Sequence, residues 1–98
     1  MHRNVYTIAI LPGKEGAIKE LIGELETLAD ATRREDGCIE YGFYRDTSET
    51  NTIVSFERWL DSEAEAKHWG TEHLKHAIEA MDNLLTTKPQ IFKTSKII

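Results

Sequence analysis

The chain begins with an apolar stretch that ends at a turn. Residues 4–11 (NVYTIAIL) are rich in β-branched side chains and are followed directly by Pro12 and Gly13, so this pattern predicts a strand. From residue 14 to residue 35 the apolar positions recur every three or four residues, which predicts one long amphipathic helix. Gly37 is a natural stop after that helix.

Two more strand-like segments flank a polar turn. Residues 38–46 (CIEYGFYRD) and 51–59 (NTIVSFERW) are rich in β-branched and aromatic residues, and the pair is predicted to form a hairpin. Alternation places Ile39, Tyr41 and Phe43 on one face, while other apolar residues fall on the opposite face. A sheet that is apolar on both faces is covered on both sides. Because the helices of so short a chain can cover only one face, the pattern predicts a homodimer.

The second half of the chain starts with an interrupted helix. A helix is predicted from Ser62, which matches a capping box with Glu65. Gly70 interrupts it, and Thr71 is suited to cap a new helix over 71–85.

A last strand is predicted over residues 89–98, after the break at Pro89. The resulting order, β-α-β-β-α-β, is an α+β ferredoxin-like arrangement. A chain of 98 residues rarely holds two cores, so we predict a single domain over 1–98. Its composition, 40% hydrophobic and 30% charged, is that of an ordinary folded domain.

The charge balance narrows the range of partners. The formal net charge is −5, and lysine and arginine do not cluster, so the chain lacks the basic surface that nucleic acids or anionic membranes need. The N-terminal apolar run is too short for a signal peptide core or a membrane span. The single cysteine, Cys38, cannot form an internal disulfide. We therefore predict a cytoplasmic protein with no nucleic-acid or membrane partner.

Three of the four histidines fall within residues 66–77 (AKHWGTEHLKHA). At about 100° per helical residue, His68 faces the same way as the apolar residues of its helix. On the next helix, His73 lies at the flank of the apolar face and His76 points to solvent. His73 and His76 are three residues apart, and Glu72 lies four residues before His76. Because no Cys or Asp nearby completes a ligand set and the H-E-x-x-H signature is absent, we predict no metal site.

Three segments, taken together, resemble the antibiotic biosynthesis monooxygenase family, which includes small quinol monooxygenases. They are EDGCIEYGFYRD (35–46), VSFERWLDSEAEAKH (54–68) and EHLKHAIEAM (72–81). The matching residues are Glu35, Gly37, Cys38, Tyr41, Glu57, Trp59, His68, His73 and Leu74. Glu72 departs from the family pattern, which often has proline there.

The resemblance spans essentially the whole chain and carries expectations about structure and chemistry. It implies a dimeric α+β barrel with a pocket in each subunit between sheet and helices. It also implies oxidation of a small aromatic substrate by O₂ without flavin, haem or metal, and hence no cofactor. Haem-degrading relatives would need a histidine ten residues after Trp69, where this chain has Glu79, so that branch of the family fits poorly.

The same resemblance assigns candidate roles. His68, an inward imidazole, is the candidate catalytic base that removes a phenolic proton and so makes the substrate electron-rich enough to reduce O₂. Tyr41 and Trp59 are candidate substrate-binding residues, followed by Trp69 and His73. The alternative is that His68 is a hydrogen-bonded core residue and that the aromatic side chains simply pack in the core.

Two other functions stay open on the sequence alone. A domain with the same pocket could bind or isomerise a phosphorylated signal molecule without oxidising it. Arg45 and Arg58 each share a strand face with apolar residues and could supply the positive charge that such a ligand needs. The remaining possibility is a structural dimer whose pocket is filled by its own aromatic side chains.

Overall fold

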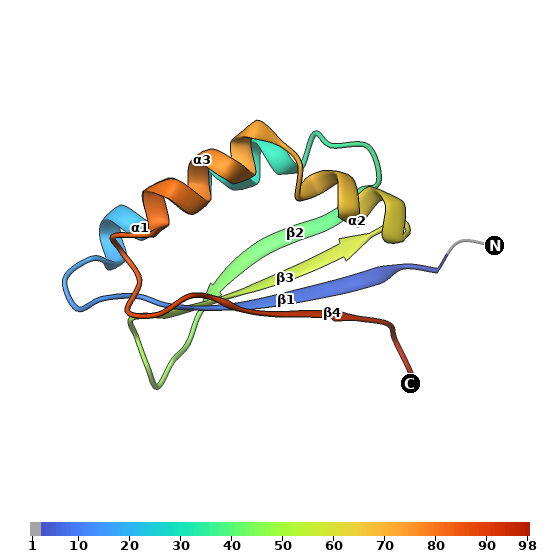
Figure 1. Cartoon of the computed structure of the whole chain (residues 1–98). Coiled ribbons are helices and arrows are strands. Elements are labelled where there is room, and N and C mark those ends of the chain that lie inside the picture. The colour runs from blue at the N-terminus through green and yellow to red at the C-terminus, as the bar shows by residue number, and fades with distance from the viewer. Residues whose placement is uncertain (1–2) are drawn as a thin grey trace.

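The computed structural model describes residues 3–98, in which four strands form one antiparallel sheet and three helices cover it. Along the chain these elements are β1 (Val5–Pro12), α1 (Ile18–Thr32), β2 (Cys38–Arg45), β3 (Thr52–Trp59), α2 (Ser62–His68), α3 (Glu72–Met81) and β4 (Gln90–Thr94). The sheet order is β2-β3-β1-β4, and all three helices lie on the same face (Figure 1). The predicted α+β ferredoxin-like order, with its second helix divided near Gly70, is confirmed.

Several predicted boundaries were too wide. Helix α1 begins at Ile18 and not at residue 14 because the chain turns at Gly16, whose φ is +83°. Helix α3 ends at Met81 and not at residue 85. Strand β4 ends at Thr94, which pairs with Tyr6 near the start of β1, so the residues beyond it have no strand to extend along.

Of the two predicted N-terminal caps, the cap of α3 is confirmed and the cap of α2 is wrong. Thr71 caps α3 as predicted, since its side chain accepts a hydrogen bond from the backbone N–H of Leu74. The predicted capping box at Ser62 is wrong, because Asp61 has extended backbone and its Oδ1 accepts from the N–H of Ala64 at 2.9 Å. Glu65 is then free to point into the interior, where it is buried.

A β-bulge corrects the predicted faces of β2. Cys38 pairs with Trp59, but Glu40 and not Ile39 pairs with Arg58, so the register shifts by one residue there. Ile39 is therefore 48% exposed, whereas Tyr41 faces the helices and is buried. Alternation alone had placed Ile39 and Tyr41 on the same face.

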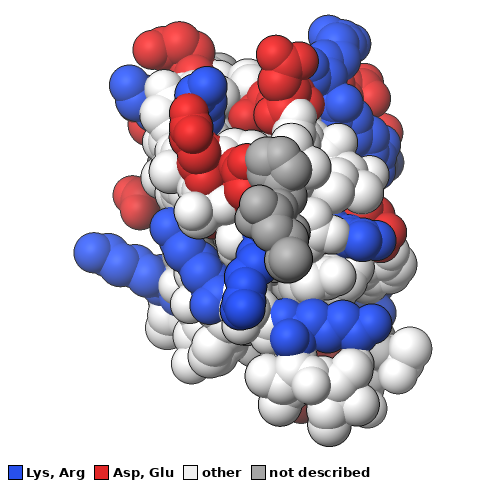
Figure 2. Space-filling view, turned by 90° about the vertical axis from the view of Figure 1, so that its right-hand side faces the viewer, with Lys and Arg blue, Asp and Glu red and all other residues white. Residues whose placement is uncertain are grey.

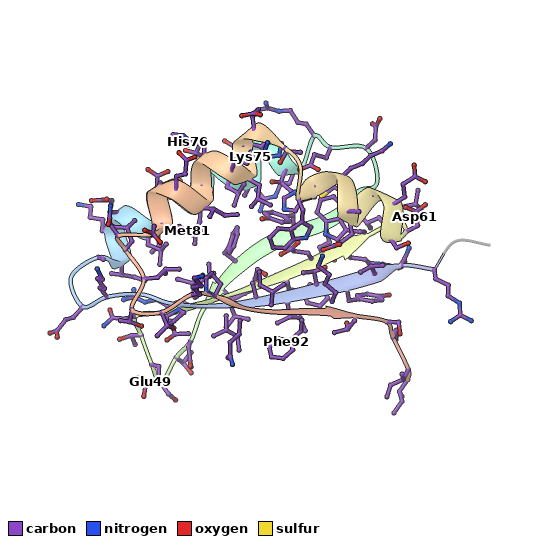
Figure 3. All side chains as sticks on the ribbon, viewed as in Figure 1. Glu49, Asp61, Lys75, His76, Met81 and Phe92 are labelled. Carbon is purple, nitrogen blue, oxygen red and sulfur yellow. The ribbon has the colours of Figure 1, made fainter. Side chains whose placement is uncertain are left out.

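The sheet face away from the helices is apolar, as the pattern predicted, and no segment within residues 3–98 covers it. Phe56, Ile8 and Phe92 lie in one row across β3, β1 and β4. Figure 3 shows Phe92 below the sheet, opposite the helices, and the side chain is 48% exposed. The neighbouring Tyr6 packs against Phe56 with ring centroids 6.3 Å apart.

Charged side chains of both signs share the end of the molecule that carries α2 (Figure 2). Arg58 is half-buried, and its guanidinium lies over the Tyr6 ring, 5.6 Å from the ring centroid, on the uncovered sheet face. Among residues 3–98, no helix has the length and hydropathy to cross a membrane.

The turn after α1 provides a test of the packing between α2 and the sheet. Gly37 has φ +85°, and a Cβ there would lie 2.5 Å from Cβ of Ala64 on α2. We expect Gly37→Ala to lower the unfolding free energy by about 2–4 kcal/mol, from backbone strain and overlap combined. Gly23→Ala, in α1 where a Cβ meets nothing within 4 Å, should raise it by about 1 kcal/mol. Urea denaturation of both variants measures the difference, and equal stability would contradict the close approach of α2.

Candidate active site

A cavity of about 550 Å³ lies between the helices and the sheet. This is within the usual size of small-molecule sites, roughly 300–1,000 Å³. Its apolar wall is formed by side chains from α1, α3, the strands and the segment after α3, namely Leu11, Leu25, Leu28, Phe43, Leu74, Ile78, Met81, Leu85 and Ile91. Its polar groups include Thr7, Tyr41, Ser55, Glu57 and His68. The cavity therefore offers an apolar body with a few polar groups that converge on it.

The sheet register gathers the polar groups into one row. Tyr41 on β2 pairs with Glu57 on β3, Glu57 pairs with Thr7 on β1, and Thr7 pairs with Lys93 on β4. Paired residues have their Cβ atoms about 4.5–5.5 Å apart and point to the same face. Four segments that are distant in sequence thus place their polar side chains side by side beneath the helices, and we call these four residues the polar row.

Glu57 occupies the centre of the polar row and is only 5% exposed. Its Oε1 accepts a hydrogen bond from Trp59 Nε1 at 3.1 Å, and its Oε2 accepts one from Ser55 Oγ at 3.0 Å. Burial raises the pKa of the Glu57 carboxyl from 4.5 to about 7, although the two hydrogen bonds lower it. The nearby carboxylates of Glu65 and Glu35 raise it further.

Glu65 on α2 is buried as well, but its charge is balanced. Its Oε2 accepts hydrogen bonds from Trp69 Nε1 at 2.7 Å and from Thr7 Oγ1 at 3.2 Å. Its Oε1 is 3.4 Å from Lys93 Nζ, which also lies 5.0 Å from the centre of the Trp69 ring. These contacts fix Trp69 at the cavity wall and join α2 to both β1 and β4.

A third carboxylate, Glu35, joins two histidines. Its Oε2 lies 2.7 Å from Nδ1 of His68 and 2.7 Å from Nε2 of His73. A carboxylate can only accept hydrogen bonds, so the network assigns protons to both of these nitrogens. Glu35, in the turn before β2, therefore fastens the end of α2 to the start of α3.

His68 is 2% exposed and lines the cavity. Burial lowers the pKa of its imidazole below the ordinary value, although the Glu35 carboxylate acts in the opposite direction. With Nδ1 donating to Glu35, Nε2 of the neutral ring keeps a free lone pair. Within residues 3–98, the hydrogen bond described for the His68 ring is the one from Nδ1 to Glu35.

Aromatic rings hold the imidazole in place. Trp59 packs on it with ring centroids 4.8 Å apart, and Tyr41 meets it edge-on at 5.4 Å. Burial also raises the pKa of the Tyr41 hydroxyl, and Glu57 adds to this shift. Tyr41 therefore keeps its proton at neutral pH and can act as a hydrogen-bond donor in the cavity.

The donor types of Glu35, His68 and His73 are those of a two-histidine, one-carboxylate metal site, and their ligand atoms all lie within 4.8 Å of one another. Tetrahedral bonds of about 2.0–2.1 Å to a metal would hold such atoms roughly 3.3 Å apart. The observed N···O distances of 2.7 Å are shorter and are those of hydrogen bonds. The absence of a metal stays a prediction, but the pair of histidines on which it was based, His73 and His76, is not the one that the fold brings together.

The structure separates the predicted site residues into three environments. His68, Tyr41 and Trp69 line the cavity. Trp59 is fully buried behind His68, and His73 is 28% exposed and bound to Glu35; neither is part of the cavity wall. His76 projects from α3 away from the sheet, as predicted (Figure 3).

Arg45 and Arg58 do not line the cavity. Arg58 donates to Asn4, directly before β1, and Arg45 donates to the carbonyl of Thr50 in the β2–β3 turn. Cys38 is half-buried, and burial raises the pKa of its thiol to about 11, Glu35 contributing second. The thiol is therefore a poor nucleophile at neutral pH.

Sequence reasoning did not identify Glu35, Glu57 and Glu65 as site residues. A signal was present for Glu57, because it lies two residues before Trp59 and four after Ile53 on the face that alternation assigns to the core. A carboxylate on a buried strand face needs an explanation, either a partner or a function. Glu35 matches the family motif, but nothing in the sequence places it beside His68 and His73, which are 33 and 38 residues away.

The sequence profile of the antibiotic biosynthesis monooxygenase family matches residues 4–80. The chain therefore belongs to this family, as the resemblance of its motifs implied. The fold agrees: a conserved protein from Methanosarcina mazei Go1 superposes with a TM-score of 0.93 at 22% identity, over 97% of this chain and 94% of that one.

Two relatives are similar in sequence. The protein sll1783 of Synechocystis sp., which is described as uncharacterized, is 34% identical over 90 residues, covering 92% of this chain and 58% of its own length. YcnE of Bacillus subtilis, named provisionally as a monooxygenase, is 28% identical over 76 residues, or 78% of this chain and 80% of YcnE. The chain thus spans less than two thirds of the Synechocystis relative.

Because Glu57 is buried without a cation beside it, we predict that the stability of the protein depends on pH. Its pKa is raised by folding, so between pH 4.5 and about 7 the folded state holds more protons than the unfolded state, and stability falls as the pH rises. Between pH 5 and pH 8 the wild type should therefore lose on the order of 3 kcal/mol of unfolding free energy relative to Glu57→Gln, which has no ionisable group at this position. Glu79→Gln, an exposed control on α3, should show no such trend. Denaturant titrations across this range test it, and parallel curves for Glu57→Gln and the wild type would show that the carboxyl is not desolvated.

Proposed function

We propose that the protein is a cofactor-independent monooxygenase that oxidises a quinol or a related phenolic aromatic with O₂. The observation that carries this proposal is the state of His68. Its Nδ1 is held by Glu35 at 2.7 Å, which leaves Nε2 as a free base on the wall of an apolar cavity. A buried, neutral imidazole in a fixed tautomer is well suited to accept a phenolic proton.

The chemistry follows from that proton transfer. A phenolate in an apolar cavity is a far better electron donor than the neutral phenol, so it can pass one electron to O₂. Recombination of the two radicals then forms a carbon–oxygen bond on the ring. One oxygen atom of O₂ ends as a ring carbonyl and the other as water, which takes up the phenolic proton and the ring hydrogen that the new carbonyl replaces.

The other candidate residues take different parts in this proposal. Tyr41 keeps its proton and offers a hydrogen bond to a substrate oxygen, and Trp69 supplies a flat wall, held by Glu65. Trp59 and His73 act indirectly, because Trp59 packs on the His68 ring and His73 shares the Glu35 carboxylate. The family membership of the chain and the name of YcnE support a monooxygenase.

The proposal includes a homodimer in the cytoplasm. The uncovered sheet face presents Tyr6, Ile8, Phe56 and Phe92 as an apolar surface, which a second copy could bury. The single cysteine, with its raised pKa, is compatible with a reducing compartment.

A charge on the uncovered sheet face tests the dimer. We expect Phe56→Lys to convert a dimer to a monomer at micromolar concentration, because it would bury an unpaired ammonium group at the centre of the interface. Ala66→Lys, on the exposed surface of α2, adds the same charge elsewhere and should leave the dimer intact. Light scattering after size-exclusion chromatography gives the mass, and a monomeric wild type would refute this part of the proposal.

Oxygen consumption with a panel of hydroquinones tests the activity itself. We expect uptake by wild-type protein that has been treated with a chelator and shows no flavin or haem absorbance. His68→Ala should lower kcat by about 10²–10⁴-fold, since the general base is lost. His76→Ala, an exposed histidine on the neighbouring helix, should keep the wild-type rate.

Each result of this experiment has a defined meaning. A folded wild type that consumes no O₂ with any member of the panel refutes the quinol oxidation. Equal O₂ uptake by His68→Ala and the wild type would support the oxygenase activity but refute the role of His68 as the base.

A further inference from the structure

We propose that Glu57 is a second proton-transfer residue, which faces the substrate from the sheet while His68 faces it from α2. Both side chains line the cavity, and they belong to opposite layers of the molecule. This inference rests on the proposed monooxygenation and adds to it the residue that protonates the oxygen released as water.

The first support is the lack of any cation beside Glu57. Among the ion pairs that the structure describes for residues 3–98, Lys93 is bound to Glu65, and His68 and His73 are bound to Glu35. Glu57 has only neutral donors, although it is 5% exposed. A buried carboxylate without a cation is costly to keep for structural reasons alone, because no opposite charge offsets the free energy of removing its charge from water.

The second support is the way its donors orient the carboxyl. Ser55 Oγ accepts a hydrogen bond from the backbone N–H of Ala9 at 2.9 Å, so its own proton is directed to Glu57. Trp59 Nε1 can only donate. Each oxygen of Glu57 thus receives one fixed donor and keeps a second lone pair, and the carboxyl holds the same orientation in its charged and its neutral form.

The third support is the set of groups around Glu57. Tyr41 faces it from β2, and the carboxylates of Glu65 on α2 and of Glu35 in the turn before β2 act on it from the other side of the cavity. Lys93, across Thr7 in the polar row, is paired with Glu65. Burial and the two carboxylates raise the pKa of Glu57 to about 7, so both forms are populated at neutral pH.

The proton balance of the reaction requires such a group. His68 takes the phenolic proton and returns it to the peroxide anion that forms on the ring. When the O–O bond breaks, neutral Glu57 donates its proton to the departing hydroxide, which leaves as water. As the carbonyl forms, the ring C–H bond breaks and its electron pair becomes part of the carbonyl bond. The proton released from this C–H bond restores the neutral carboxyl of Glu57.

The test compares Glu57→Gln with the wild type, His68→Ala and Glu79→Gln. In anaerobic stopped-flow mixing with an active hydroquinone, Glu57→Gln should bind substrate and form the phenolate spectrum as the wild type does, whereas His68→Ala should not. With O₂ present, kcat of Glu57→Gln should fall by about 10²-fold or more. Glu79→Gln should match the wild type in both assays.

The pH profile distinguishes proton transfer from a structural role. Wild-type kcat should decline above about pH 7 as Glu57 loses its proton, and Glu57→Gln should lack this decline. Ser55→Ala serves as a second variant, usable even if Glu57→Gln does not fold. It removes a hydrogen bond that lowers the Glu57 pKa, so the decline should move to higher pH.

The outcomes separate this inference from the proposed function. A wild type that consumes O₂, together with a folded Glu57→Gln that keeps its kcat within threefold, would overturn the role of Glu57 and leave the monooxygenase standing. An unchanged pH profile in Ser55→Ala would overturn it in the same way. A wild type with no O₂ uptake would overturn both.

Discussion

The antiparallel register of β2, β3 and β1 is the constraint on which the candidate site depends. Glu57 faces the cavity because β3 alternates strictly, and Tyr41 lies beside it because a bulge shifts β2 by one residue after Cys38. Without that bulge, Glu40 would pair with Glu57, and two carboxylates would meet on the covered face. A shift of one residue reverses the face of every later side chain in a strand, so the bulge decides which chemistry the cavity contains.

The second determinant is the way in which three carboxylates share the available cations and donors. Glu65 has Lys93, and Glu35 has two imidazoles, so both charges are compensated where they are buried or partly buried. Glu57 alone has neutral partners. The same network thus holds His68 in one tautomer, fixes Trp69 at the wall, and leaves one carboxyl whose protonation is sensitive to pH near neutrality.

Helical phase and strand alternation predicted a large part of this arrangement. The inward direction of His68, the outward direction of His76 and the apolar sheet face all follow from periods of 3.6 and 2 residues. The cap at Thr71 follows from its residue type directly after the break at Gly70. The errors arose where one residue departs from the period or competes for a local bond. Ile39 lies at the bulge, and Asp61 replaces Ser62 as the helix cap.

By itself, then, the sequence determined the element order, the family and the direction of the three histidines, because these depend on local periodicity and on motifs within single segments. Only the tertiary structure decided that Glu35 joins His68 to His73, that Trp59 and His73 stand behind the cavity wall, and that Glu57 is buried without a cation. The physical reason is that hydrogen-bond partners and desolvation are set by which distant segments pack together. A sequence read one segment at a time does not contain that information.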